Sequence, residues 1–174
     1  FLSFFSIITP AFADLNVDVI ADGLNNPWEI VFGPEGEIYF TERDGRLWII
    51  EEFGEAKIIE TFPKSGSVEG GTLGLALDPM FKENQKIYIY QTNLELEFFQ
   101  NKVFSFTIDD YTLTNKEIII DDIPGAPWHD GGRIVFGPDE KLYITTGDAI
   151  NPGWSQDLSS LAGKILRINS DGTI

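Results

Sequence analysis

Residues 132–145, with the sequence Gly-Arg-Ile-Val-Phe-Gly-Pro-Asp-Glu-Lys-Leu-Tyr-Ile-Thr, contain the pattern that decides the fold. An apolar strand leads into a turn that contains Pro138, and a second strand follows with Tyr143 at its centre. Proline presets one dihedral angle of a tight turn, and the neighbouring glycine and acidic residues tolerate the reversal. The segment therefore predicts a β-hairpin.

The same hairpin pattern occurs twice more, earlier in the chain. Residues 28–41 carry it around Pro34 and Tyr39, and residues 74–90 carry it around Pro79 and Tyr88. Further strands are expected after the hairpins, at residues 45–50, 56–60, 101–106, 116–120 and 163–168. Repeats with up to four short strands each are typical of the blades of a β-propeller. An open sandwich of unrelated hairpins is the alternative, and the triplication of the hairpin argues against it.

The number of repeats indicates that the sequence is part of a larger ring. Propellers close with about 4–8 blades, whereas the pattern here accounts for about two and a half to three. We therefore expect residues 14–174 to form the N-terminal blades of a single propeller domain that continues beyond this sequence. Expressed alone, this part is expected to be inactive and prone to aggregation, because an open ring leaves strand edges unpaired.

Residues 1–13 differ in composition from the rest of the chain. They carry no charge and end in Ala11-Phe12-Ala13, the small-x-small pattern at which signal peptidases cleave. The apolar run before Pro10 is shorter than the roughly 20 residues that span a bilayer. We interpret residues 1–13 as a signal peptide that lacks its charged start; a short buried strand or helix is the alternative. The sequence thus predicts an exported protein, periplasmic, cell-surface or extracellular, without a transmembrane segment.

The composition argues against several classes of function. The 28 acidic residues outnumber the 12 basic ones and give a net charge of −16, which disfavours nucleic acid and anionic membranes as partners. A single histidine and no cysteine exclude the usual zinc sites. The acid pairs Asp109-Asp110 and Asp121-Asp122 lack the ligand spacing of a calcium loop and are interpreted as turns between strands. No metal ligand is expected in this part of the chain.

The single histidine, His129, lies just before the third hairpin, where Trp128 precedes it and Gly131-Gly132 follow. In a propeller the innermost strand of each blade lines the central channel, so the loop that enters this strand lies at the channel mouth. A neutral imidazole with a pKa of about 6.5 is a suitable proton acceptor for an alcohol. Adjacent glycines allow the backbone to approach a flat ligand closely. A hydrogen-bonded structural histidine in a turn is the alternative.

Two further polar residues occupy comparable loops. Glu69 precedes Gly70-Gly71 at the start of the second hairpin, and Asp148 directly follows the third hairpin. Because equivalent loops of successive blades lie at the same end of the ring, Glu69 and His129 are expected to point towards a common axis. Glu69 as a solvated loop acid and Asp148 as a turn-capping residue are the alternatives.

Six motifs occur in order along residues 27–168. They are Pro27-Trp28; Thr41-Glu42-Arg43 with Gly45-Arg46; Glu69-Gly70-Gly71 with Leu73-Gly74-Leu75 and Asp78-Pro79; His129 with Gly131-Gly132-Arg133 and Gly137-Pro138-Asp139; Tyr143 with Thr146-Gly147-Asp148; and Gln156-Asp157-Leu158 with Gly163-Lys164-Ile165-Leu166-Arg167-Ile168. In this order they resemble the soluble glucose/sorbosone dehydrogenase family, and within it the aldose sugar dehydrogenase branch.

The resemblance implies a fold, a cofactor and a reaction. It implies a six-bladed propeller that binds pyrroloquinoline quinone at the channel mouth and requires Ca²⁺. It also implies a quinoprotein that oxidises the anomeric hydroxyl of an aldose to a lactone by hydride transfer to the quinone, with an external electron acceptor. By the same resemblance, His129 is the catalytic base and touches the cofactor, as does Glu69. The calcium ligands and the cations that hold the cofactor's carboxylates are expected in later blades, beyond this sequence.

Two positions depart from the glucose enzymes of the resembled family. Glu69 replaces a glutamine, which is compatible with the aldose-type branch, and Trp128 replaces an aspartate that touches the sugar. An indole stacks on an apolar sugar face but accepts no hydrogen bond from a hydroxyl. The resemblance thus makes Trp128 and Asp148 substrate-binding residues and favours a broad aldose preference. A non-catalytic propeller binding module of the same lineage and a metal-dependent lactonase remain the alternatives.

Overall fold

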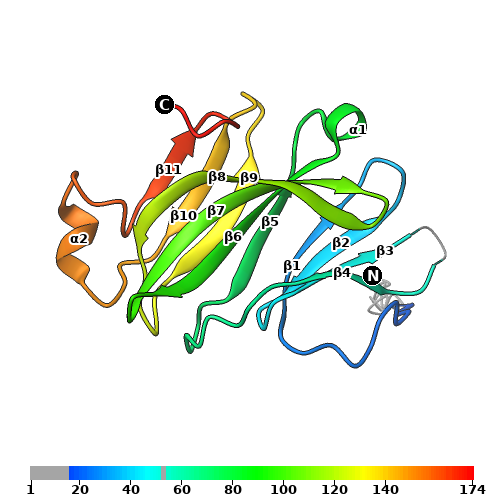
Figure 1. The fold of residues 1–174 in the computed structure, drawn as a ribbon, viewed down its shortest axis with the longest axis horizontal. Coiled ribbons are helices and arrows are strands. Elements are labelled where there is room, and N and C mark those ends of the chain that lie inside the picture. The colour runs from blue at the N-terminus through cyan, green and yellow to red at the C-terminus, as the bar shows by residue number, and fades with distance from the viewer. Residues whose placement is uncertain (1–15, 52–53) are drawn as a thin grey trace, which may run out of the picture.

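The computed structural model describes residues 16–51 and 54–174, which form three antiparallel sheets (Figure 1). The first sheet contains β1 (Pro27–Phe32), β2 (Ile38–Glu42), β3 (Arg46–Ile50) and β4 (Lys57–Thr61). The second contains β5 (Thr72–Leu77), β6 (Lys86–Glu95), β7 (Phe98–Asp109) and β8 (Thr112–Pro124). The third contains β9 (Gly131–Phe136), β10 (Leu142–Thr146) and β11 (Ile165–Ile168). The predicted signal peptide lies outside the described residues.

The arrangement confirms the all-β prediction and the interpretation of the repeats as propeller blades. In each sheet the strands pair in sequence order, and the first strands β1, β5 and β9 lie side by side (Figure 1). Two blades have four strands and the third has three, which agrees with the predicted two and a half to three blades. Two short helices, α1 (Phe81–Asn84) and α2 (Pro152–Gln156), were not expected from the sequence.

Strand β6 shows how the alternating sequence builds the core. Side chains of a strand point alternately to its two faces, so Ile87 and Ile89 pack in the cluster between the first and second sheets. Tyr88 and Tyr90 pack in the cluster between the second and third sheets. All four are fully buried. The second blade therefore has an apolar face towards each neighbour, as a central blade requires.

The prediction that Asp121-Asp122 forms a turn is wrong. Both residues lie inside β8, where the pairing with β7 shifts from Asn101–Ile123 to Val103–Ile120. This shift is a β-bulge, which accommodates extra residues without ending the strand. Asp109-Asp110, by contrast, lies where β7 ends and turns into β8, as predicted.

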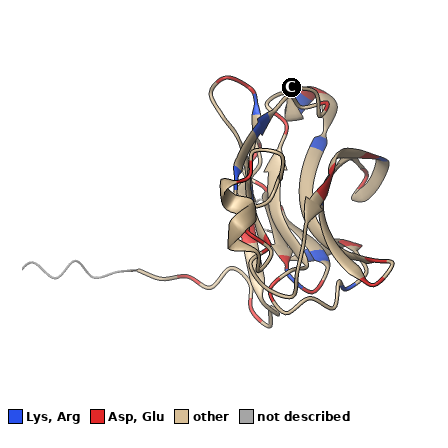
Figure 2. Cartoon of the chain, turned by 90° about the vertical axis from the view of Figure 1, so that its left-hand side faces the viewer, with Lys and Arg blue, Asp and Glu red and all other residues tan. Residues whose placement is uncertain are grey.

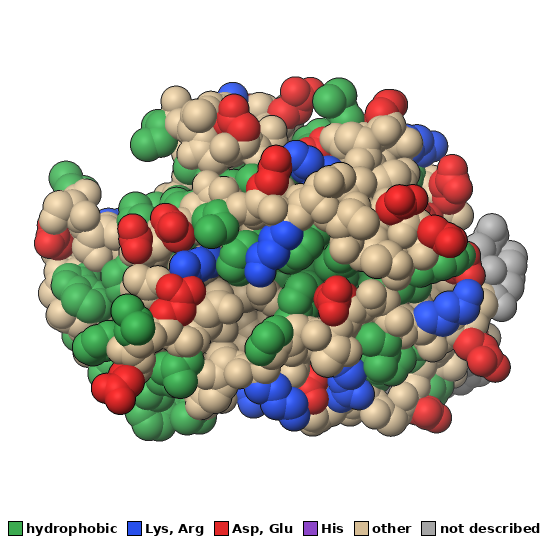
Figure 3. Space-filling view, in the orientation of Figure 1, with side chains coloured by type: hydrophobic (Ala, Val, Ile, Leu, Met, Phe, Trp, Pro, Cys, Tyr) green, Lys and Arg blue, Asp and Glu red, His purple; other side chains and the backbone are tan. Residues whose placement is uncertain are grey.

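Acidic residues occur in the connections at both ends of the strands, and basic residues are fewer (Figure 2). Apolar side chains are visible between the charged ones on the surface shown in Figure 3. The innermost strands also expose apolar side chains: Ile30 and Phe32 of β1 and Val135 of β9 are more than half exposed. These side chains form part of a hollow of about 360 Å³ lined by β1, β5 and β9. The innermost strands thus line an open channel wall, as expected for propeller blades.

An ion pair crosses this channel wall from the third blade to the first. Arg133 Nη1 of β9 lies 2.5 Å from Glu29 Oε1 of β1, and the guanidinium lies 4.5 Å from the ring centroid of Trp28. The side chain of Glu29 is only 10% exposed, and its second oxygen, Oε2, has no hydrogen-bond partner among the described residues. Arg133 therefore compensates a carboxylate that is largely withdrawn from water.

We expect Arg133→Met to destabilise the full-length protein by about 1–3 kcal/mol, because it leaves the Glu29 carboxylate buried without a cation. Adding Glu29→Gln should recover part of this loss. The matched control is Arg167→Met, whose Asp139 partner at 2.8 Å is 34% exposed, so the cost should stay below about 1 kcal/mol. Urea unfolding measures all three, and equal losses for the two arginines would contradict the prediction.

Candidate active site

Three connections meet at one end of the sheets, at the lower edge of Figure 1. They are the segments between β4 and β5, between β8 and β9, and between β10 and β11. Each connection contributes one residue to a hydrogen-bonded set centred on His129. The backbone N–H of His129 bonds to Glu69, and its imidazole bonds to Asp148. The predicted convergence of Glu69 and His129 is therefore present in the structure, and Asp148 joins them.

The backbone of His129 is held on both sides. Its N–H donates to Glu69 Oε2 at 2.8 Å, and its carbonyl accepts the N–H of Ala149 at 3.1 Å. Its φ of +64° lies in the left-handed region, which is uncommon for a residue with a side chain. The contacts from two other loops offset the cost of this conformation and fix the direction of the imidazole.

The imidazole of His129 pairs with Asp148. His129 Nδ1 and Asp148 Oδ1 lie 2.8 Å apart, and the same carboxylate oxygen accepts the N–H of Ile150 at 3.0 Å. A carboxylate beside Nδ1 favours the neutral tautomer that carries its hydrogen on Nδ1, which leaves Nε2 as a proton acceptor. The histidine side chain is 58% exposed, so Nε2 is accessible to a ligand. This pair is an oriented base that faces solvent.

The loops of Glu69 and His129 are joined through their backbones as well. The N–H groups of Val68 and Glu69 both donate to the carbonyl of Pro127, at 3.1 and 3.0 Å. The hydrogen bond from the Glu69 backbone to Pro127 thus positions this residue beside the His129 loop, and one of its carboxylate oxygens accepts the N–H of His129. Trp128, predicted to bind substrate, sits between Pro127 and His129 with 46% of its surface exposed.

The glycines beside His129 have a packing role that the sequence did not indicate. Gly131 and Gly132 have φ values of +73° and +109°, which glycine adopts at little cost. A Cβ on Gly131 would lie 2.6 Å from the nitrogen of Gly147, and one on Gly132 would lie 2.7 Å from Leu73 Cδ1. Protein atoms therefore occupy the Cβ side of both glycines: Gly131 allows close packing within the third blade, and Gly132 allows the third blade to pack closely against the second.

Sequence reasoning missed a set of polar residues beneath the site: Ser67, which is partly buried, and Tyr90, Asn101 and Asp130, which are buried. All four bond to one another or to the loop of residues 126–130. The only local signal was the adjacency of Asp130 to His129. The contacts join residues from three parts of the chain, and no sequence spacing indicates them.

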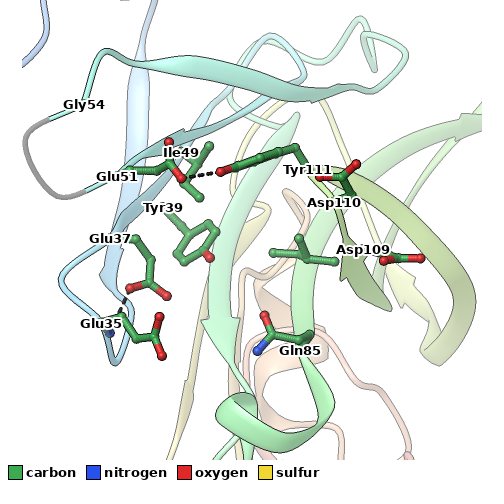
Figure 4. Close-up of a pocket in the computed structure, with 11 residues that line it drawn as sticks. Glu35, Glu37, Tyr39, Ile49, Glu51, Gly54, Gln85, Asp109, Asp110 and Tyr111 are labelled. Carbon is green, nitrogen blue, oxygen red and sulfur yellow. Dashed lines mark hydrogen bonds between the residues drawn. The ribbon is translucent and has the colours of Figure 1, made fainter.

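A separate cavity of about 750 Å³ lies at the opposite end of the sheets (Figure 4). It is lined by the turns between β1 and β2, β3 and β4, and β7 and β8. Two of its five acidic side chains are already engaged: Glu37 accepts the N–H of Glu35 at 2.8 Å, and Glu51 pairs with Lys57 at 2.8 Å and with the hydroxyl of Tyr111. It contains none of the predicted site residues, so we do not place the reaction there.

Among the described residues, 16–51 and 54–174, no group of three or more His, Cys, Asp or Glu side chains is arranged to hold a metal ion. No helix there has the length and apolar character needed to cross a membrane.

Comparisons with known proteins place the chain in one family. The sequence profile of the family described as Glucose / Sorbosone dehydrogenase matches residues 24–174. The chain is 29% identical to quinoprotein glucose dehydrogenase B of Acinetobacter calcoaceticus, over 90% of this chain and 39% of that protein. It is 28% identical to the Hedgehog-interacting protein of Mus musculus, over 90% of this chain and 26% of that protein.

A solved structure matches the fold as well. The PQQ-bound form of aldose sugar dehydrogenase from Streptomyces coelicolor superimposes with a TM-score of 0.83 at 34% identity, over 90% of this chain and 48% of that one. The chain thus spans less than half the length of each of these three relatives.

Proposed function

Because the chain belongs to the glucose/sorbosone dehydrogenase family, we propose that it forms the base-bearing part of a quinoprotein that oxidises an aldose to a lactone. The observation that carries the proposal is the His129–Asp148 pair, 2.8 Å apart and open to solvent at the mouth of the blades. An oriented neutral imidazole is what removal of a proton from a sugar hydroxyl requires.

The residues at the mouth are compatible with the part of pyrroloquinoline quinone that would accept the hydride. His129 Nε2 makes no hydrogen bond to any described residue and is accessible. Glu69 would meet a cofactor that bears carboxylates, but its charge is partly balanced because Oε2 accepts the His129 N–H at 2.8 Å. When bound, the quinone accepts the hydride of the sugar. His129 and Glu69 would border it on this side, and calcium ligands are proposed to lie in later blades.

Each site residue then has one task in the proposed reaction. His129 Nε2 takes the proton of the anomeric hydroxyl, and the ring becomes a cation. Asp148 stabilises this cation through Nδ1 and holds the ring direction. Trp128, half exposed beside the base, offers an apolar surface on which a sugar ring stacks, which suits several aldoses rather than one.

The proposal is tested by loading the full-length protein with pyrroloquinoline quinone and Ca²⁺ and by assaying several aldoses with an artificial electron acceptor. We expect turnover with more than one aldose and none without the cofactor. Cofactor binding without turnover would favour the second candidate, a non-catalytic binding module, which the 28% identity to a Hedgehog-interacting protein supports. An exported location and an external electron acceptor belong to the same proposal.

Asp148→Asn should lower kcat by between about 10- and 10⁴-fold, because an amide no longer fixes the Nδ1–H tautomer or stabilises the imidazolium. KM for the sugar should change little. The control is Asp157→Asn: Asp157 is an exposed acid that accepts the N–H of Ser159 at 2.9 Å, and it should leave kcat unchanged. A raised KM with unchanged kcat would instead assign Asp148 to sugar binding alone.

A further inference from the structure

Asp130 is a buried carboxylate directly after the proposed base. It is 2% exposed and faces the second blade. Its Oδ1 accepts the N–H of Ala126 at 3.0 Å and Asn101 Nδ2 at 3.1 Å, and its Oδ2 lies 3.2 Å from the hydroxyl of Ser67. Its carbonyl accepts the hydroxyl of Tyr90 at 2.8 Å. Every polar group of this residue except its N–H is therefore used to tie chain segments together.

These partners come from the three parts of the protein that must stay in register for the site to exist. Ala126 starts the loop that carries His129, and Ser67 precedes Glu69 in the neighbouring connection. Asn101, in β7, belongs to the second blade. One carboxylate thus fixes the His129 loop and the Glu69 loop to the same sheet.

The partners are themselves fixed. Asn101 is fully buried, accepts the hydroxyl of Thr92 at 2.7 Å and donates to the carbonyl of Pro124 at 3.0 Å. The hydroxyl of Ser67 accepts the N–H of Gly70 at 2.9 Å, and this bond closes a turn that contains Glu69. A network whose members are all satisfied is rigid, because moving any member leaves a buried polar group unpaired.

Burial raises the pKa of the Asp130 carboxyl, while the hydrogen bonds from Ala126, Asn101 and Ser67 oppose that rise. A carboxylate in so dry a position is costly to keep. This carboxylate nevertheless lies directly after His129, whose backbone has a left-handed conformation.

We propose that Asp130 is a positioning residue, which sets the directions of His129 and Glu69 from beneath the site without touching the substrate. The inference rests on the proposed function. Its physical basis is that a misplacement of about 1 Å at a reacting group can lower a rate by about 10²-fold.

Asp78 provides a matched control at the opposite end of the second blade, which Asp130 faces. It is 8% exposed, its Oδ1 accepts Met80 N–H at 2.9 Å and Asn84 Nδ2 at 3.0 Å, and its Oδ2 accepts the hydroxyl of Tyr88 at 3.0 Å. It therefore has the same residue type, similar burial and the same set of donors as Asp130, but it lies in the turn between β5 and β6, away from the site.

The first measurement is hydrogen exchange of the full-length protein without cofactor. Asp130→Ala should speed exchange in residues 66–71 and in residues 126–131 together, although these segments are far apart in sequence. Asp78→Ala should speed exchange near residues 78–85 and leave both site segments unchanged. Faster exchange spread evenly over the blade in both variants would overturn the inference.

The second measurement is steady-state kinetics of the cofactor-loaded protein. Asp130→Ala should lower kcat by about 10- to 10²-fold with little change in the sugar KM, whereas Asp78→Ala should keep kcat within about twofold at a similar loss of stability. Asp130→Asn should recover most of the activity, since its amide oxygen can accept the Ala126 N–H and its NH₂ can donate to Ser67. Equal kcat losses for the alanine and asparagine variants, or for Asp130→Ala and Asp78→Ala, would overturn the inference.

A wild-type protein that binds cofactor but turns over no sugar would overturn the proposed function, and the exchange result would still stand on its own.

Discussion

Replacing His129 with alanine should lower kcat for an aldose by about 10²–10⁴-fold, the usual worth of a positioned base. The imidazole bonds to the Asp148 carboxylate at 2.8 Å through Nδ1, and its Nε2 remains accessible. No other described group at this mouth offers such a nitrogen acceptor. Cofactor affinity, measured by optical titration with pyrroloquinoline quinone, should remain largely intact, because the cations that hold its carboxylates are proposed to lie in later blades.

A second variant separates chemistry from backbone strain. Alanine is disfavoured at the left-handed φ of +64°, whereas asparagine tolerates this conformation. His129→Asn should therefore be as slow as His129→Ala but as stable as the wild-type protein. Turnover equal to wild type in either variant would remove His129 from the mechanism, whatever their stability.

Gly147→Ala should be the most damaging substitution that removes no functional group. A Cβ at this position would lie 1.6 Å from the carbonyl oxygen of His129, a distance that no pair of unbonded atoms can hold. The loop of residues 125–130 must therefore move outward, which separates His129 from Glu69 and Asp148. We expect kcat to fall by about 10²-fold and the protein to lose about 1–3 kcal/mol of stability from overpacking.

Gly153→Ala is the control for this prediction. Gly153 belongs to α2 near the same site, but its Cβ would meet only Asn151 Oδ1 at 3.3 Å. It should leave both kcat and the urea midpoint nearly unchanged. If Gly147→Ala behaved like Gly153→Ala, the close approach of the Gly147 and His129 backbones would have no consequence for the site.

The sequence alone determined the blades and the position of the proposed base. Alternating apolar residues and Pro-containing turns are local features, and they placed the strands of all three sheets and the single histidine at the entry to an inner strand. Local patterns were less informative about irregularities. The bulge at Asp121-Asp122 lies inside β8 because its pairing with β7 continues on both sides, which no property of two adjacent acids indicates.

Only the tertiary structure decided which side chains meet. Glu69 and His129 are separated by 60 residues and touch because two blades pack side by side. The sequence shows Asp130 as one more loop acid beside Gly131 and Gly132, yet the packing turns it inward and fills the space beside both glycines with protein. Strand periodicity depends on a residue's immediate neighbours, whereas the direction of a loop side chain depends on the donors that folding brings to it, and these come from distant parts of the chain.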